Sequence, residues 1–200
     1  MTGRTLGVEA VGDALVDALR PHLGDGDLTC ILSDHADVRV LDVDWKARFG
    51  APTFVGRART VHTNGGVAPI RTIVPTLRRG DVLVVRSNHP SVAVFGDRLA
   101  AAATTRGVAG VVIDGMVRDV AALEAGTLPV VARGVRPNRS DAAAVGTHDT
   151  RLAIGSTWLA PHDLVVGDRN GVVGIPASSF EAIFDGLDGW IDAEQTASER

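Results

Sequence analysis

The residues best suited to chemistry stand in two short segments near the middle of the chain. One is the pair Gly96-Asp97, and the other is the segment 114–119, which ends in Arg118-Asp119. Each segment follows an apolar run and precedes a helical pattern, so each should form a loop at the carboxyl end of a strand. Ligands of open parallel sheets bind at that edge, where loops and helix N-termini converge. We therefore expect the two loops to face each other.

The residue types in these loops fit a small acid and a divalent cation. The N–H groups of Leu99 and Ala100, in the first turn of a helix, would be unpaired and partly positive, which suits a carboxylate. Arg118 would add a bidentate, permanently charged guanidinium to the same carboxylate. Asp97 and Asp119 would offer hard oxygen ligands, which suit Mg²⁺ or Mn²⁺ better than zinc. The acid would be held while the cation polarised a neighbouring carbonyl.

A purely structural interpretation of the same residues stays open. Asp97 and Asp119 each stand at the start of a predicted helix, where aspartate is a common N-cap. Arg118 and Asp119 could instead form a surface ion pair, which contributes little stability. Asp114-Gly115, directly after a strand, is typical of a turn.

Other catalytic centres find little support. The six histidines show neither His-x-His nor His-x-x-x-His spacing, so no histidine-rich metal site is expected. No serine stands in a Gly-x-Ser-x-Gly context, which argues against a hydrolase nucleophile elbow. Lys46 is the only lysine and lies in a charged stretch, which disfavours Schiff-base chemistry. Cys30, the only cysteine, lies in an apolar run and is interpreted as a small buried residue.

Composition and charge narrow the class of protein. Apolar residues make up 45% of the chain and charged residues 22%, a balance that argues against disorder. A net charge of −4 with scattered arginines offers no general attraction to phosphate backbones, so no nucleic-acid partner is expected. Neither a signal-peptide pattern nor a run of about 18 apolar residues is present, so no membrane association is expected. With a single cysteine, these features predict a cytoplasmic protein.

Hydrophobic periodicity predicts the elements that position the two loops. Three short apolar runs are typical of strands buried on both faces, and helical spacing separates them. In chain order these strands and helices are 82–85, 97–106, 111–113, 119–125 and 129–132. Strand, helix, strand, helix, strand at these lengths predicts a pair of right-handed βαβ units and a central parallel portion of the sheet.

The rest of the chain predicts helices at both ends and more β structure. We find no linker and no internal repeat, so residues 1–200 are predicted to form a single domain of the α/β class. The turn 168–171 between apolar runs indicates a β-hairpin. The remaining expected elements are a helix over 7–20, an apolar segment 28–32, a strand 53–61, a helical patch 69–77, and a final amphipathic helix 177–195.

The central motif resembles the family of 4-hydroxy-4-methyl-2-oxoglutarate aldolases and the related regulator-of-ribonuclease-activity A proteins. The likeness covers about residues 28–195, and its most specific part is the Asp-Gly-x-x-Arg-Asp core with its upstream glycines. The segments that carry the likeness are 33–34, 56–61, 79–85, 96–99, 107–119 and 168–173.

This resemblance implies a swivelling β/β/α fold with a C-terminal helix, assembled as homotrimers or hexamers with active sites between subunits. It implies that Arg118 binds the carboxylate of pyruvate and that Asp119 ligates the metal directly. Asp97 would reach the metal through water. Aldolase members of the family also use a glutamate from the C-terminal helix of a neighbouring subunit. Glu194 is the best match here for that metal ligand, and Glu181 is the second.

The functional hypothesis is therefore a class II, metal-dependent lyase. It would cleave the C3–C4 bond of a small 2-oxo acid to give pyruvate, and the same site would decarboxylate oxaloacetate. Gly96, Leu99, Ala100 and Arg118 would contact the substrate, while Arg118 and Asp97 would be the catalytic residues.

Two alternatives stay open. One is a non-catalytic regulator that binds ribonuclease E. The regulator subgroup tends to lack the upstream acid, so the presence of Asp97 favours the enzyme. The other is a diverged enzyme that acts on a different 2-oxo acid. Residues 86–90, where relatives often carry an aspartate and glycines, indicate an altered pocket wall.

Overall fold

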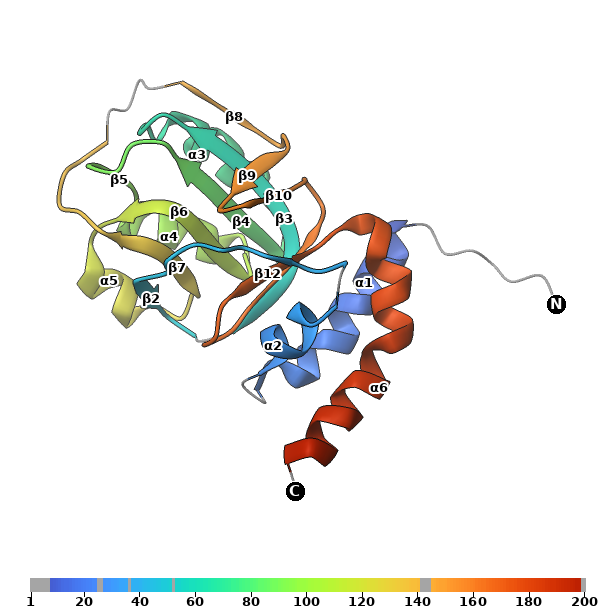
Figure 1. The fold of residues 1–200 in the computed structure, drawn as a ribbon. Coiled ribbons are helices and arrows are strands. Elements are labelled where there is room, and N and C mark those ends of the chain that lie inside the picture. Colours follow the sequence, from blue (N-terminus) through green and yellow to red (C-terminus); the bar gives the residue numbers. More distant parts are fainter. Residues whose placement is uncertain (1–7, 25–26, 36, 52, 141–144, 199–200) are drawn as a thin grey trace.

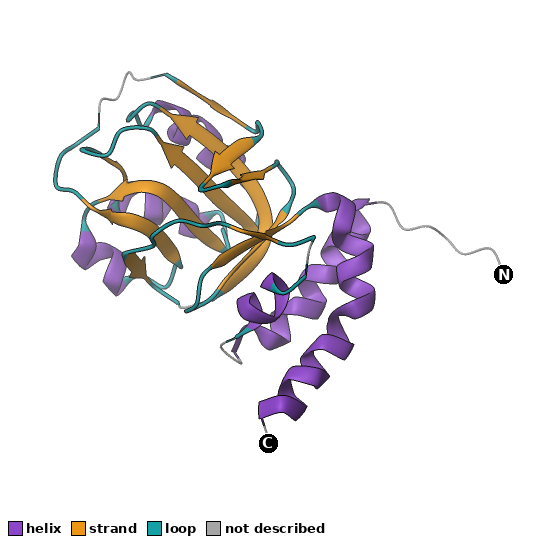
Figure 2. Cartoon of the chain, viewed as in Figure 1, coloured by secondary structure: helices purple, strands orange, loops and turns teal. Residues whose placement is uncertain are grey.

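A computed structural model describes residues 8–24, 27–35, 37–51, 53–140 and 145–198 of the chain. A large mixed sheet lies at its centre, with three helices against one face and a separate group of helices at one end (Figure 1 and Figure 2). No helix in the described ranges is long and apolar enough to span a lipid bilayer.

The helices are α1 Val8–Leu19, α2 Leu28–Ser33, α3 Ala68–Ile73, α4 Asp97–Thr105, α5 Val120–Ala125 and α6 Phe180–Ser198, with 3₁₀ turns at Arg20–Gly24, Val74–Thr76 and Ala177–Ser179. The strands are β1 Arg39–Val40, β2 Ala47–Phe49, β3 Phe54–Thr63, β4 Asp81–Ser87, β5 Ala93–Phe95, β6 Gly110–Val117, β7 Val130–Val135, β8 Gly146–His148, β9 Leu152–Ile154, β10 Thr157–Leu159, β11 Leu164–Gly167 and β12 Val172–Ile175. The main sheet has the order β1-β12-β11-β3-β4-β6-β7-β2, with β5 beside β6 and β8 beside β3, and β9 and β10 form a separate hairpin.

Four adjacent strands, β3, β4, β6 and β7, form the parallel part of the sheet. The predicted series 82–85, 97–106, 111–113, 119–125 and 129–132 is confirmed as β4, α4, β6, α5 and β7. Both faces of these strands are buried. Leu83 and Val85 pack toward the side of α3, α4 and α5, while Val82 and Val84 pack toward the side of β9 and β10. This two-sided burial is the reason that the strands are continuous apolar runs.

The second helical group packs on the β11–β12 hairpin at the end of the sheet (Figure 1). The hairpin turns at 168–171 as predicted, with Asp168 N–H donating to the Gly171 carbonyl at 3.0 Å. The predicted helices 7–20 and 177–195 correspond to α1 and α6, although residue 7 lies outside the described residues. Their buried side chains form one apolar cluster, which includes Val11, Leu15, Leu19, Leu28, Leu32, Ile183, Leu187 and Ile191.

The prediction that Cys30 is buried is wrong, because its side chain is exposed. The apolar segment 28–32 forms helix α2, and a helix turns about 100° per residue, so its side chains point in several directions. Leu28 and Leu32, one turn apart, face the core, and Cys30 between them faces outward.

The prediction of a turn at Asp114-Gly115 is also wrong. Strand β6 continues to Val117, and a register shift against β7 between Ile113 and Met116 lets the strand pass through this position. Asp114 is buried, with 4% of its surface exposed, and pairs with Arg133 of β7. The Asp-Gly pattern here reflects an irregular strand and an ion pair between the buried Asp114 and the exposed Arg133 rather than a turn.

Candidate functional site

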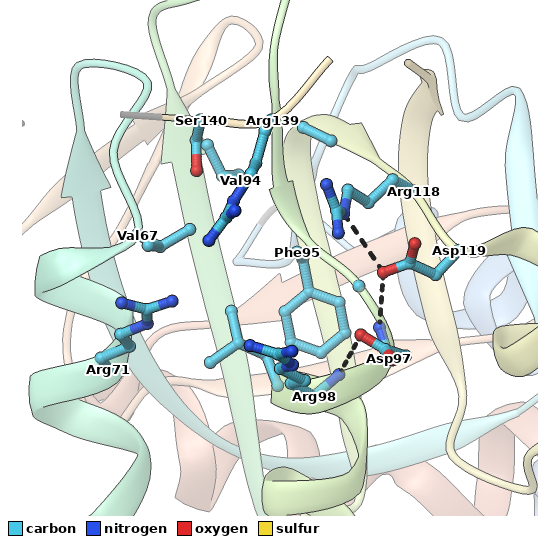
Figure 3. A pocket seen from close by; sticks show the side chains of 13 residues that line it. Val67, Arg71, Val94, Phe95, Asp97, Arg98, Arg118, Asp119, Arg139 and Ser140 are labelled. Atoms are coloured by element: carbon cyan, nitrogen blue, oxygen red, sulfur yellow. Dashed lines mark hydrogen bonds and ion pairs between the residues drawn. The ribbon is translucent and has the colours of Figure 1, made fainter. Parts of the chain in front are cut away.

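The two predicted loops meet in one pocket at the carboxyl edge of the parallel strands (Figure 3). Its volume is about 130 Å³. This is below the roughly 300–1,000 Å³ of pockets for drug-sized ligands, so the pocket suits a small molecule. The lining residues are Val67, Arg71, Ala93, Val94, Phe95, Gly96, Asp97, Arg98, Leu99, Arg118, Asp119, Arg139 and Ser140.

Gly96 allows the two loops to approach closely. It is the N-cap of α4 and links β5 to that helix. A Cβ atom at this position would collide with the Asp119 carboxylate and would press on the Arg118 side chain. The glycine is therefore required by the close approach of the second loop, because it alone leaves room for these side chains.

Asp119 stands between β6 and α5 in the left-handed region, at φ 59° and ψ 46°. Non-glycine residues seldom adopt this conformation, and aspartate is among those that tolerate it best. One oxygen of its carboxylate, Oδ2, accepts a hydrogen bond from the Asp97 N–H at 3.2 Å and another from Arg118 Nε at 3.2 Å. Asp119 thus reaches across to the first turn of α4.

This geometry corrects the N-cap interpretation of the two aspartates. Asp97 is the first residue of α4 rather than its N-cap, and its carboxylate accepts the Arg98 N–H at 2.6 Å. Asp119 is at the N-cap position of α5, but its side chain makes no capping hydrogen bond to that helix. The carboxylates are turned toward the pocket because the sheet places the two loops side by side.

Only one of the two predicted amides is unpaired. Ala100 N–H donates to the Gly96 carbonyl at 2.9 Å, so the expectation that this group is available is wrong. The reason is that α4 begins at Asp97, which makes Ala100 the first residue able to form an intrahelical bond. Leu99 N–H has no hydrogen-bond partner within the described ranges, and Leu99 lines the pocket.

Electrostatics favour the charged form of Asp119. Partial burial by itself raises the pKa of this carboxyl, but the hydrogen bond from the Asp97 N–H and the positive charge and hydrogen bond of Arg118 together bring the pKa below its ordinary value. Arg118 and Asp119 are each about one-third exposed, at 35% and 31% of their side-chain surface. The ion pair predicted as a structural alternative does exist, and it forms part of the pocket wall.

The donor set fits a hard divalent cation. In the part of the chain that the structure describes, no group of three or more His, Cys, Asp or Glu residues could hold a metal ion. Asp97 and Asp119 are two carboxylates in one pocket, and the second oxygen of Asp119 accepts no hydrogen bond from a described residue. Mg²⁺ is commonly held by one or two carboxylates, with water and substrate completing its coordination. Such a site would use these two side chains.

Comparison with known proteins identifies the family. Residues 29–173 match the RraA-like family, described as Aldolase/RraA. This chain belongs to the RraA-like family. The match includes the pocket residues described above, from Val67 to Ser140, and confirms the resemblance found in the sequence motifs.

Similar proteins carry names that describe different functions. A Halalkalibacterium halodurans protein named "Putative 4-hydroxy-4-methyl-2-oxoglutarate aldolase" is 33% identical over 132 residues, which are 64% of this chain and 62% of that protein. The chain thus spans less than two-thirds of that relative's length.

Two solved structures share the fold of this RraA-like chain. One is described as an S-adenosylmethionine: 2-dimethylmenaquinone methyltransferase from Geobacillus kaustophilus, with 33% identity, a TM-score of 0.70, and coverage of 74% of this chain and 93% of that one. The other is described as the RNA-processing inhibitor RraA from Thermus thermophilis, with 27% identity, a TM-score of 0.69, and coverage of 74% and 91%. The predicted α/β fold with its parallel portion and C-terminal helix is confirmed.

Several residues with predicted roles lie elsewhere in this RraA-like chain. Glu194 and Glu181 are exposed on α6, which belongs to the other helical group, and neither lines the pocket. Residues 86–90 do not form its wall either. Arg86, Ser87, Asn88 and Pro90 line a different pocket, which they share with Asp114 and Arg133.

Three cations of the pocket, Arg71, Arg98 and Arg139, were not predicted from the sequence. Arg139 follows β7, the next parallel strand after β6, so the rule that points to loops at the carboxyl edge could have found it. Arg98 directly follows Asp97 and could have been included with it. Arg71 lies on α3, which has no motif that indicates a functional role.

Proposed function

We propose that this chain is a divalent-metal-dependent lyase that breaks the C3–C4 bond of a small 2-oxo acid and releases pyruvate, with Mg²⁺ or Mn²⁺ held by Asp119 and Asp97. The observation that carries the proposal is the contact between the two loops, in which the Asp119 carboxylate, the first turn of α4 and Arg118 share one small pocket. Membership in a family that contains aldolases supports it.

Four residues of the pocket, Arg118, Leu99, Asp119 and Asp97, have a role in this chemistry. The guanidinium of Arg118 and the unpaired N–H of Leu99 bind the carboxylate next to the 2-oxo group. Asp119 and Asp97 would hold a divalent cation, which would supply Lewis-acid polarisation of a carbonyl oxygen. Asp97, which is exposed, orients a water molecule toward the proton that leaves the substrate.

The same C3–C4 bond breaks in the hydroxy-2-oxo acid and in oxaloacetate, and its electron pair goes to C3 in both. In the aldol cleavage, a base removes the proton of the C4 hydroxyl, the C3–C4 bond breaks, and its electron pair moves onto C3 in conjugation with the 2-oxo group. A proton added at C3 then completes pyruvate. With oxaloacetate, the piece that leaves is carbon dioxide, and the same electron pair is left on C3. One site therefore accounts for both activities.

Assembly is part of the proposal. Because Glu194 and Glu181 lie on α6 and away from the pocket of their own chain, either could act at a site only in a neighbouring subunit. We propose a homotrimer or hexamer in which α6 approaches the pocket of the next subunit and Glu194 adds a third carboxylate.

The test is pyruvate release from oxaloacetate and from 4-hydroxy-4-methyl-2-oxoglutarate, with Mg²⁺ and with EDTA. Asp119→Asn is the preferred variant, because asparagine also tolerates the left-handed backbone of this position. We expect turnover to require the metal and to fall on the order of 100-fold or more in Asp119→Asn, as when one electrostatic group is removed from a reacting centre.

Asp17→Asn is the matched control, since Asp17 is exposed on α1 and outside the pocket, and it should retain activity. Absence of turnover from folded protein supplied with Mg²⁺ or Mn²⁺ would refute the proposal that these two acids are substrates. A non-catalytic regulator of a ribonuclease, or an enzyme for another 2-oxo acid, would then be the interpretation to pursue.

A further inference from the structure

The pocket holds more positive charge than the proposed chemistry uses. Four arginines and two aspartates line it, an excess of two positive charges before any cation is bound. Arg118 is paired with Asp119, but Arg71, Arg98 and Arg139 have no part in holding the metal or the first carboxylate. Like charges gathered at one small pocket attract anions, so this group of exposed arginines is a candidate binding site for an anion.

Two of these arginines point into the same part of the pocket. Arg71 comes from α3 and Arg139 from the segment after β7, which are far apart in the sequence. In Figure 3 their guanidinium groups extend into the side of the pocket away from Asp97 and Asp119. The side chain of Ser140, which also lines the pocket, lies next to Arg139.

No described residue neutralises either of these two guanidinium groups. Among the described residues, neither forms an ion pair or a side-chain hydrogen bond. Other arginines of the chain do have such partners, as Arg59 does with Asp149 and Arg57 with Asp13. Arg71 and Arg139 thus differ from arginines that stabilise the fold, because their hydrogen-bond donors stay available to a ligand.

The middle of the pocket is apolar. Val67, Val94 and Phe95 lie between the arginine side and the aspartate side in Figure 3. A short carbon chain could lie on this apolar floor, in which Val94 and Phe95 are almost completely buried, while its two ends met opposite surroundings. The pocket therefore complements a short molecule with a 2-oxo acid at one end and a second anionic group at the other.

We propose that Arg71 and Arg139 bind a second carboxylate, and so select 2-oxo dicarboxylic acids over 2-oxo monocarboxylic acids of the same length. This inference rests on the proposed function, since it takes the first carboxylate and the 2-oxo group to lie at Arg118 and Asp119. The planar guanidinium groups match a carboxylate in charge and in hydrogen-bond geometry. The volume of about 130 Å³ restricts the ligand to a short acid.

Binding of two five-carbon acids tests the inference without turnover. 2-Oxoglutarate and 2-oxopentanoate differ only in the distal carboxylate, and their affinities are compared by titration calorimetry in the presence of Mg²⁺. We expect wild type to bind 2-oxoglutarate about tenfold or more tightly, as expected for hydrogen bonds to a charged group. Arg71→Gln combined with Arg139→Gln should remove this preference and leave the affinity for 2-oxopentanoate within about threefold of wild type.

Arg79→Gln is the matched control. Arg79 is exposed in the turn before β4, at the amino end of the parallel strands, and its loss of charge should leave both affinities unchanged. Circular dichroism of each variant checks that the exposed substitutions leave the fold intact.

The outcomes distinguish failure of the second-carboxylate site from failure of the proposed 2-oxo acid site. A double variant that still prefers 2-oxoglutarate, or a wild type that binds both acids equally, would overturn the second-carboxylate site and leave the lyase intact. If neither acid binds to wild type with Mg²⁺, the proposed 2-oxo acid site is itself wrong, and the inference is refuted with it.

Discussion

Two aspartates, Asp119 in the pocket and Asp168 in the β11–β12 turn, show how the same side chain serves different purposes. Asp168 is 1% exposed and accepts four hydrogen bonds, from Thr29 N–H at 2.8 Å, Thr29 Oγ1 at 2.6 Å, Asn170 N–H at 2.8 Å and Gly171 N–H at 3.2 Å. Asp119 is one-third exposed and accepts its two hydrogen bonds, from Asp97 and Arg118, on a single oxygen.

The two carboxylates differ in whether an oxygen remains available to accept a bond from a ligand. Both oxygens of Asp168 are occupied by the protein, and through Thr29 they tie helix α2 to the hairpin. Such a carboxylate stabilises the fold and has no capacity for anything else. Asp119 is held in place through one oxygen while the other accepts no hydrogen bond from the described residues. An acid that is positioned but incompletely paired is the one suited to bind a cation.

The largest expected effect is a loss of folding stability when Asp168, but not Asp119, is replaced. Asp168→Asn replaces an acceptor oxygen by an N–H₂ donor facing the Thr29 N–H, so we expect the free energy of unfolding to fall by about 3 kcal/mol. Asp119→Asn should lose less than about 1 kcal/mol, because its partners can turn to water. Urea unfolding at a fixed protein concentration measures both. Equal losses in the two variants would mean that exposure and pairing do not distinguish them.

The second prediction concerns the stabilisation of the protein by Mg²⁺, which should depend on Asp119 and not on Asp168. Mg²⁺ at a hundredfold excess over its Kd should stabilise wild type by about 2.7 kcal/mol, which corresponds to a rise in Tm of roughly 5–10 °C. Asp119→Asn should lose this rise, whereas Asp168→Asn should retain it despite its lower starting Tm. Differential scanning fluorimetry with and without EDTA provides the measurement. A rise of the same size in Asp119→Asn would show that the cation binds elsewhere.

The smallest effect concerns Asp149, which is as exposed as Asp119, at 33%, but fully paired. Arg59 donates to both of its oxygens, at 2.8 and 2.9 Å. The hydrogen bond with Arg59 lowers the pKa of Asp149, against the opposing effect of burial. Because the folded pKa lies below the unfolded value of about 3.9, the pair stabilises the protein above that pH and ceases to do so as pH falls through the folded pKa.

We therefore expect Asp149→Asn to be about 1 kcal/mol less stable than wild type at pH 7, a value kept small because of the exposure of the pair. The gap should shrink below about pH 4. Unfolding curves from pH 7 to pH 3 measure it, with Asp188→Asn as the control that shows no such trend. A gap independent of pH would indicate that packing at this position, rather than charge, accounts for the loss.

Much of the fold could be predicted from local patterns. The buried strands, the helices between them and the hairpin turn at 168–171 depend on side-chain periodicity and turn chemistry, which neighbouring residues express directly. Elements that depend on contacts with distant parts of the chain were not predicted. Strand β5 has three residues and forms only because β6 lies beside it. The segment that forms α2 was predicted to be apolar, but its helical conformation was not predicted.

For the candidate site, the identity of four residues was predicted from the sequence, but their orientation was not. Arg118, Asp119, Asp97 and Gly96 were found from a motif and from the rule that loops at the carboxyl ends of parallel strands carry function. Their orientation was not predictable. Ala100 N–H is engaged within α4, and Asp119 turns from its own helix to the next loop, because these details depend on where each helix begins and on one left-handed residue.

The sequence alone determined the residue types of the candidate site, the order of the central strands and helices, and the edge of the sheet at which the candidate site lies. Each of these depends on neighbours along the chain. The tertiary structure alone brings Arg71 of α3 and Arg139, beyond β7, to the pocket of Asp119. Strands β3, β4, β6 and β7 lie side by side, so the segments at their carboxyl ends converge at one edge although dozens of residues separate them. Sequence distance carries no information about that convergence until the strand order is known.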